Sequence, residues 1–148
     1  MREKLGTMDK FNFLLGTWQL EYNVPKSLFS DADNGKGYGE FKRILNSRYV
    51  SFDYSAKLSK GEAAAHAVFA WDEKNRIYKY WWFEDSGAFM TATCNFVDEN
   101  TLCLNWHNSL LVQSFNITEN GKVILRMKYP LNTNDYDLIL EVVFTKKE

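Results

Sequence analysis

The side chains that could do chemistry in this chain are dispersed, and few of them fall into a motif. The two histidines, His66 and His107, have no nucleophile nearby in the sequence, and there is no Gly-rich phosphate loop, G-x-S-x-G or H-E-x-x-H motif. Cys94 and Cys103 lack a CxxC partner, so a metal or redox site is poorly supported. The sequence therefore predicts a protein that is not an enzyme and holds no metal or cofactor.

One charged side chain, Arg43, falls on an otherwise apolar face. The segments 39–45 and 48–58 predict a hairpin. Its tight turn sets three facing pairs: Gly39 with Tyr54, Phe41 with Phe52, and Arg43 with Val50. An inward arginine needs an anionic partner or water. Arg43 could therefore bind the anionic group of a ligand, or it could lie near the barrel rim and reach solvent along its aliphatic stem.

The segment 62–71 carries small side chains at alternate positions. A tight turn at Lys60 and Gly61 would place one set on the inner wall, with Phe69 opposite Phe52: Ala63, Ala65, Ala67, Phe69 and Trp71. Small side chains at regular spacing leave room, which is typical of a ligand cavity. Two alternatives stay open, namely tight packing against a bulky neighbouring strand and a one-residue slip that would turn His66 inward.

Aromatic residues occupy both faces of the segment 77–84. One face has Tyr78, Tyr80 and Trp82, and the other has Ile77, Lys79, Trp81 and Phe83. Because Lys79 favours solvent, the first face is expected to offer its rings and hydroxyls to the interior. Trp81 and Phe83 would then point outward and could form a homodimer surface. The next segment, 88–97, is ambiguous, since it turns inward either Met90, Ala92, Cys94 and Phe96 or Phe89, Thr91 and Thr93.

The elements that position these residues begin at the N-terminus. Residues 7–15 predict a short helix, with Thr7 as its N-cap and Gly16 as its stop. The segment 17–24 alternates apolar and polar side chains and predicts a half-buried strand, whose Trp18 is expected in the barrel floor. The polar residues 26–37 predict a long loop, which could gate a cavity or be a plain surface loop.

The second half of the chain predicts further hairpins. Residues 101–107 and 110–117 are joined near Asn108 and Ser109. A three-residue loop ending at a left-handed Gly121 keeps apolar residues opposite one another: Ile117 with Val123, Phe115 with Leu125, and Leu111 with Tyr129. Residues 1–148 thus predict a single all-β domain, an up-and-down antiparallel β-barrel of about ten strands with a short N-terminal helix closing one end.

Several motifs resemble known barrels. Gly16-Thr17-Trp18 resembles the G-x-W of the lipocalin and fatty-acid-binding (calycin) superfamily. Over residues 11–90 the chain is similar to a bacterial lipocalin-like family catalogued as a domain of unknown function, in these motifs: Leu15-Gly16-Thr17-Trp18, Arg48-Tyr49-Val50, Ala70-Trp71-Asp72, and Tyr78-x-x-x-Trp82 followed by Glu84-Asp85-Ser86-Gly87. Ala70 and Trp71 depart from that family's Gly and Tyr. The resemblance implies a lipocalin-like barrel and no established activity.

Composition and charge exclude several partners. The net charge of −1 gives no basic footprint for nucleic acid or anionic membrane. No apolar stretch is long enough to span a bilayer, and no signal peptide is visible. Alternation places Cys94 and Cys103 on opposite faces, which predicts free thiols in a reducing compartment. We therefore expect a soluble cytoplasmic protein.

Two classes of function remain. The first is a binding module whose interior holds a small, mainly apolar ligand, with an anionic handle at Arg43, above a floor at Trp18 and between these side chains: Phe41, Arg43, Phe52, Ala65, Ala67, Phe69, Tyr78, Tyr80 and Trp82. Such a site needs an enclosed cavity of a few hundred Å³. The second is a filled barrel that acts in structure or interaction and dimerises through Trp81 and Phe83. An enzyme on a barrel scaffold is a weaker alternative.

Overall fold

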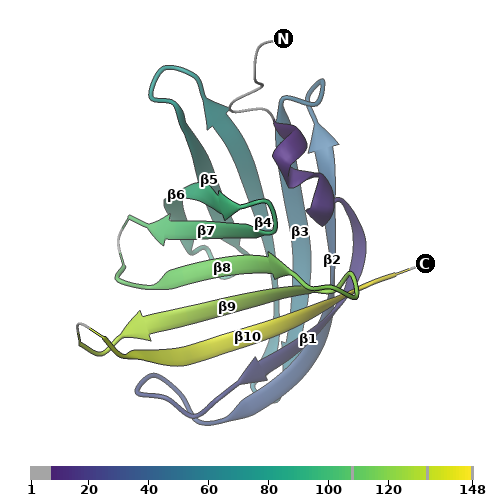
Figure 1. Cartoon of the computed structure of the whole chain (residues 1–148). Coiled ribbons are helices and arrows are strands. Elements are labelled where there is room, and N and C mark those ends of the chain that lie inside the picture. The colour runs from purple at the N-terminus through teal and green to yellow at the C-terminus, as the bar shows by residue number, and fades with distance from the viewer. Residues whose placement is uncertain (1–7, 108, 133, 148) are drawn as a thin grey trace.

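The computed structural model describes residues 8–107, 109–132 and 134–147, and they form a closed antiparallel β-barrel (Figure 1). Strands β2 to β10 follow one another around the ring in chain order, and β1 closes it between β10 and β2. Closure leaves no unpaired sheet edge. The predicted up-and-down barrel with a short N-terminal helix is confirmed.

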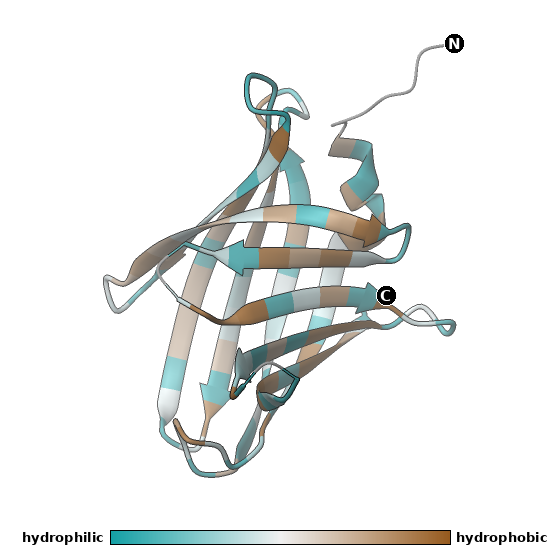
Figure 2. Cartoon of the chain, turned by 60° about the vertical axis from the view of Figure 1, so that its left-hand side comes forward, coloured by the Kyte–Doolittle hydropathy of each residue, from teal (hydrophilic) through white to brown (hydrophobic). Residues whose placement is uncertain are grey.

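The elements are short and joined mostly by tight turns. In chain order they are η1 (Met8–Leu14), β1 (Gly16–Val24), β2 (Asp33–Ile44), β3 (Tyr49–Leu58), β4 (Gly61–Asp72), β5 (Ile77–Glu84), β6 (Phe89–Asp98), β7 (Thr101–Trp106), β8 (Val112–Ile117), β9 (Val123–Pro130) and β10 (Tyr136–Lys146). Figure 1 shows β7 to β10 crossing in front of β2 to β4, with η1 beside one end of β2 and β3. Hydrophobic and hydrophilic residues alternate along many of the strands, as expected when only one face is buried (Figure 2).

Two predicted boundaries differ from the structure. The helix is a 3₁₀-helix over Met8–Leu14, and Thr7, its predicted N-cap, lies outside the described residues. The predicted loop 26–37 is wrong in its second half, because β2 already begins at Asp33. Glycines explain the error. They are typical of loops, but a Cβ at Gly37 would lie 1.9 Å from the backbone oxygen of Ser55, so this glycine lets β2 approach β3 closely.

Most of the predicted registers are confirmed. The β2–β3 hairpin pairs Gly39 with Tyr54, Phe41 with Phe52 and Arg43 with Val50. The β8–β9 loop has Gly121 at φ +81°, and it pairs Ile117 with Val123 and Phe115 with Leu125. Asn108, the predicted link between β7 and β8, lies outside the described residues.

The β3–β4 register differs from the prediction by two residues. The turn lies at Ser59 and Lys60, so Phe52 faces Ala67, and the expected pairing of Phe52 with Phe69 is wrong. A shift of two residues leaves the side-chain faces unchanged, because they alternate with a period of two. Ala67 and Phe69 are therefore buried inside as expected. His66 points outward.

The neighbouring registers settle the ambiguous strand β6. Tyr80 faces Ala92 and Trp82 faces Met90 across the β5–β6 pair. Cys94 is therefore inward and buried, whereas Cys103 faces Asn95 on the other side of the sheet. Both cysteines are free thiols, as predicted.

The helix η1 closes one end of the barrel, which we call the closed end. Phe11 is fully buried, and its ring centroid lies 4.8 Å from that of Phe69, 5.3 Å from Tyr78 and 5.1 Å from Phe96. These contacts join η1 to β4, β5 and β6. The contacts with Tyr78 and Phe96 are edge-to-face, an arrangement that adds to the hydrophobic stabilisation of a core.

Trp18 is hydrogen-bonded to the C-terminal residue of η1. Its side chain is 2% exposed, and its indole N–H donates a hydrogen bond of 2.7 Å to the backbone oxygen of Leu14. The ammonium group of Lys146 lies 4.4 Å from the ring centroid, which is a cation–π distance. Trp18 therefore lies in the floor of the barrel, where the sequence placed it.

Arg43 lies at the same end and finds its anion within the chain. Its guanidinium donates to Asp9 Oδ1 at 2.7 Å and to Asn12 Oδ1 at 2.6 Å, and both acceptors belong to η1. The arginine thus tethers η1 to β2. This geometry fits the rim position that was considered for Arg43, and it places the side chain in an intramolecular ion pair.

Candidate ligand-binding site at the open end of the barrel

The opposite end, which carries loop 25–32 and the β3–β4 turn, is called the open end here. An interior cavity of about 60 Å³ lies between the packed core and this end. It is lined by Leu20, Tyr22, Phe52, Tyr54, Tyr80, Gln113, Leu125, Met127, Leu140, Val142 and Phe144. The lining is largely apolar, with three tyrosines and one glutamine.

The cavity is much smaller than the few hundred Å³ that a ligand-filled barrel was expected to show, and that expectation is wrong. Aromatic rings occupy the space. Phe41 and Phe52 stack with centroids 3.9 Å apart, and Phe52 stacks on Tyr54 at 4.5 Å. Inward rings on β2 and β3 thus lie close enough, within and between the strands, to fill the centre of the barrel with side chains.

Above the cavity, the inward-facing side chains are only half-buried. We call this group the mouth residues: Ala63, Ala65, Trp82, Met90, Leu111 and Leu140. Two of them are alanines on β4, and Met90 and Leu140 are flexible. The upper inner wall is therefore apolar and partly open to solvent, and its side chains are smallest on β4.

Hydrogen bonds fix several polar groups around the cavity. The Tyr22 hydroxyl donates to the backbone oxygen of Ser55 at 2.8 Å, and the Trp82 indole N–H donates to the Tyr54 hydroxyl at 2.7 Å. Burial raises the pKa of Tyr54 to about 12 and raises that of Tyr80 well above its ordinary value. These hydroxyls are therefore neutral at physiological pH.

Two buried polar atoms have no hydrogen-bond partner among the described residues, namely Trp106 Nε1 and Gln113 Oε1. Gln113 is 4% exposed and lines the cavity. The Trp106 ring lies edge-on to Tyr80, with centroids 5.5 Å apart. Buried polar groups are nearly always hydrogen-bonded, so an unmet donor and an unmet acceptor call for a partner from outside the chain, either water or a ligand.

The structure divides the predicted ligand-binding residues into three groups. Phe52 and Tyr80 line the cavity. Ala65 and Trp82 belong to the mouth. The others lie in the core or at the closed end, and they are Phe41, Arg43, Ala67, Phe69 and Tyr78. The β4–β5 wall therefore contributes Tyr80 to the cavity and Ala65 and Trp82 to the mouth.

Sequence reasoning missed Gln113 and Tyr22. The signal for Gln113 was available, because the confirmed register places Phe115 inward, and Gln113 lies two residues before it on the same face. Tyr22 shares the inward face of β1 with Trp18 in the same way. An inward polar residue on an otherwise apolar face is the feature to search for.

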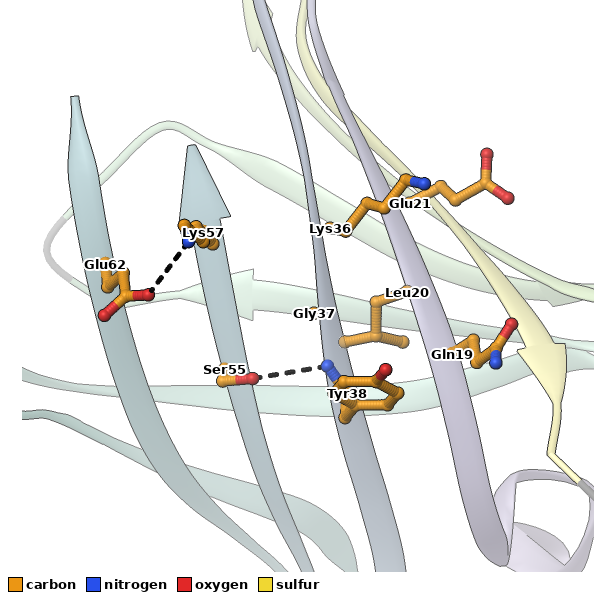
Figure 3. Close-up of a pocket in the computed structure, with 9 residues that line it drawn as sticks. All are labelled: Gln19, Leu20, Glu21, Lys36, Gly37, Tyr38, Ser55, Lys57 and Glu62. Carbon is orange, nitrogen blue, oxygen red and sulfur yellow. Dashed lines mark hydrogen bonds and ion pairs between the residues drawn. The ribbon is translucent and has the colours of Figure 1, made fainter. Parts of the chain in front are cut away.

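A second hollow of about 400 Å³ lies on the outer wall, across β1 to β4 (Figure 3). Its lining is mostly polar and carries both signs of charge: Gln19, Leu20, Glu21, Lys36, Gly37, Tyr38, Ser55, Lys57 and Glu62. Lys57 pairs with Glu62 at 3.8 Å, and the Tyr38 backbone N–H donates to Ser55 Oγ at 3.2 Å. None of the predicted ligand-binding residues lies in this outer groove.

Both histidines are exposed on the outside of the barrel. His66 Nδ1 lies 2.6 Å from Asp53 Oδ1, and His107 Nδ1 lies 2.6 Å from Thr91 Oγ1. Within the described residues, no group of three or more His, Cys, Asp and Glu side chains could hold a metal ion. No helix in the described ranges is long and apolar enough to cross a membrane.

Comparison with known proteins gives the fold and little more. No family model matches the chain, and no curated protein matches it. Among solved structures, Rv2717c from M. tuberculosis is 10% identical with a TM-score of 0.63, over 96% of this chain and 99% of that one. A de novo designed fluorescence-activating β-barrel is 12% identical with a TM-score of 0.47, over 95% of this chain and all of that one.

A third solved structure is the S-type phycobiliprotein lyase CPES from Guillardia theta. It is 7% identical with a TM-score of 0.41, over 98% of this chain and 94% of that one. At such low identity these similarities concern architecture. The chain shares its overall fold with Rv2717c, and its function must be argued from its own residues.

Proposed function

We propose that the protein binds a small, mainly apolar molecule in the open half of its barrel. The observation that supports this proposal is the unpartnered, buried Gln113 Oε1 in the lining of a cavity that continues into a half-buried apolar mouth, with a second unpartnered atom, Trp106 Nε1, on the ring that contacts Tyr80. An unmet buried donor or acceptor lowers the stability of a folded protein by about 1–3 kcal/mol, because the group has lost its hydrogen bonds to water. A bound molecule would remove that cost.

The cavity alone has room for about two water molecules. A ligand therefore places one end in the cavity and its body among the mouth residues. Met90, Met127 and Leu140 line this path, and methionine side chains rearrange with little strain. The small side chain of Ala65 on β4 leaves space for the body of the ligand.

Loop 25–32 stands at the entrance in this proposal. The Phe29 ring contacts Tyr129 of β9 with centroids 4.9 Å apart, and the Leu28 backbone N–H donates to Asp137 at 3.4 Å. Both contacts are exposed, and Phe29 is 56% exposed. Exposed contacts of this kind break easily, so we assign to the loop the role of a cover that opens for ligand entry.

The test is a fluorescence titration with N-phenyl-naphthylamine, an uncharged apolar dye. Ala65→Leu fills the mouth, whereas Ala64→Leu makes the same change on the outer face of β4, where the side chain is exposed. We expect the wild type and Ala64→Leu to bind the dye, and Ala65→Leu to bind it at least about tenfold more weakly. Equal affinity in all three proteins, or no dye binding by the wild type, would overturn the proposal.

A second function is favoured by the outer face of β5 and β6. Phe83 and Phe89 are opposite each other, 46% and 71% exposed, with Trp81 beside them on the same face. We propose that two copies associate through this aromatic face, as the sequence suggested for Trp81 and Phe83. Sedimentation of the wild type and of Phe83→Lys tests it: a dimer that becomes a folded monomer is expected, and a monomeric wild type contradicts it.

The proposed activity is binding without turnover, and the proposed location is the cytoplasm. The free thiols of Cys94 and Cys103 support a reducing compartment. The barrel and its sequence motifs also support membership of the bacterial lipocalin-like family that the chain resembles. Fractionation of the source cells, followed by thiol labelling, would contradict the location if the protein were recovered outside the cytoplasm.

A further inference from the structure

The unpartnered atoms of the open half also define the chemistry of the ligand. Gln113 Oε1 is an acceptor, and Trp106 Nε1 carries a hydrogen that it can only donate. The two side chains are 4% and 9% exposed, so bulk water does not satisfy them. A single molecule that satisfied both atoms would donate one hydrogen bond and accept another.

The strand register makes these two residues neighbours on the inner wall, and of the two Gln113 lines the cavity. Gln113 of β8 faces Leu104 of β7, and Trp106 lies two residues farther along β7 on the same inward face. They are diagonal neighbours, a relation in which side chains of this length reach each other's surroundings. Tyr80 connects them, because it contacts the Trp106 ring and lines the cavity with Gln113.

The same surroundings discriminate against charge. None of the residues that line the cavity is ionised at neutral pH, since its titratable side chains are tyrosines whose pKa values are raised by burial. A buried unpaired carboxylate or ammonium group would be strongly unfavourable there. Arg43, the cation that the sequence suggested for an anionic handle, is paired with Asp9 at the closed end.

We propose that the ligand is an uncharged molecule whose polar end carries a donor and an acceptor side by side, as in a lactam or cyclic amide, on a compact apolar ring system. This inference rests on the proposed function and specifies the ligand class of the same site. The ring N–H of such a group would donate to Gln113, and its carbonyl would accept from Trp106. The ring body would lie toward Ala65 and Trp82.

Three bicyclic probes of similar size test it by calorimetry or by chemical-shift titration. Carbostyril is a benzo-fused lactam, naphthalene lacks polar atoms, and naphthoate is an anion. We expect carbostyril to bind about tenfold or more tightly than naphthalene, because two buried hydrogen bonds form. Naphthoate is expected to bind more weakly than both.

Variants assign the preference to the named atoms. Gln113→Leu keeps the volume and removes the acceptor, so it should bring carbostyril and naphthalene to within about twofold of each other. Gln19→Leu makes the same change on the outer wall and should keep the wild-type preference. If Gln113→Leu does not fold, Trp106→Phe tests the donor in the same way, and the wild-type ranking of the three probes still decides.

The outcomes separate the two proposals. Naphthalene binding as tightly as carbostyril to the wild type, or naphthoate binding best, overturns the ligand class and leaves a binding site in the open half. No binding of any probe, with water alone satisfying Trp106 and Gln113, overturns both. A carbostyril preference that survives Gln113→Leu and Trp106→Phe also overturns the assignment.

Discussion

The closed and open ends of this barrel are built from the same kinds of side chain, yet they are packed differently. At the closed end Phe11 and Phe69 are 0% exposed, and Trp18 is 2% exposed with its indole N–H bonded to the chain. At the open end Trp82 and Met90 are half-buried, and a buried acceptor on Gln113 has no partner among the residues that the structure describes. Aromatic residues thus stabilise the core at the end that the helix covers. At the uncovered end the same kinds of residue offer a surface that a ligand can reach.

The largest expected effect comes from truncating a tryptophan at each end. Trp18→Ala should lower the free energy of unfolding by about 3–5 kcal/mol, because it removes a fully buried ring and leaves a cavity under η1. Trp82→Ala should cost less than about half of that, since the ring is already partly in water. Urea denaturation measures both, and equal losses would contradict the contrast between the ends.

Alkaline pH should weaken the open half through Tyr54. The hydroxyl has a pKa of about 12 in the folded barrel against an ordinary value of 10.0, so between these two values the unfolded chain binds fewer protons. Unfolding free energy must then fall as pH rises through this window, by an amount on the order of 2 kcal/mol for this group. Tyr54→Phe should make the fall shallower in denaturation curves recorded against pH.

Tyr38→Phe is the control for that experiment, because Tyr38 is exposed on the outer wall. It should keep the wild-type dependence on pH. The account of Tyr54 would be wrong if both variants followed the wild-type curve.

A smaller effect is expected from the ion pair that tethers η1. Arg43 and Asp9 have side chains that are 25% and 54% exposed, and partly exposed pairs contribute about 0.2–1 kcal/mol. A double-mutant cycle of Arg43→Met and Asp9→Asn should give a coupling energy in this range. Neither variant should change carbostyril affinity, and a loss of affinity in Arg43→Met would return the arginine to the ligand site.

The smallest change in stability is expected at the cover of the open end. Phe29→Ala should alter the free energy of unfolding by less than about 0.5 kcal/mol, since the ring is 56% exposed. It should speed the association of N-phenyl-naphthylamine in stopped-flow traces, because the contact with Tyr129 is lost. An unchanged association rate would show that loop 25–32 does not limit entry.

The fold could be predicted from sequence because alternation fixes the face of each side chain even when the register is off by two. Ala67 and Phe69 were placed inside on the wrong pairing and are inside nonetheless. The glycines of β2 misled the boundary, since Gly37 serves close strand approach and not a turn.

The site was less predictable for reasons of packing. Whether Phe41 and Phe52 leave a cavity depends on how their rings stack, which a pattern of residue types does not specify. The partner of Arg43 is Asp9 of η1, which lies 34 positions earlier in the chain. Gln113 was within reach, because its face followed from the predicted β8–β9 register.

The central claim is that the open half of the barrel holds a small neutral molecule, and native mass spectrometry of the protein purified from its source cells tests it most directly. We expect the wild type and Ala64→Leu to carry the added mass of one small molecule, and Ala65→Leu to appear at the mass of the bare chain. A bare wild-type chain, or the same added mass in Ala65→Leu, would contradict the account.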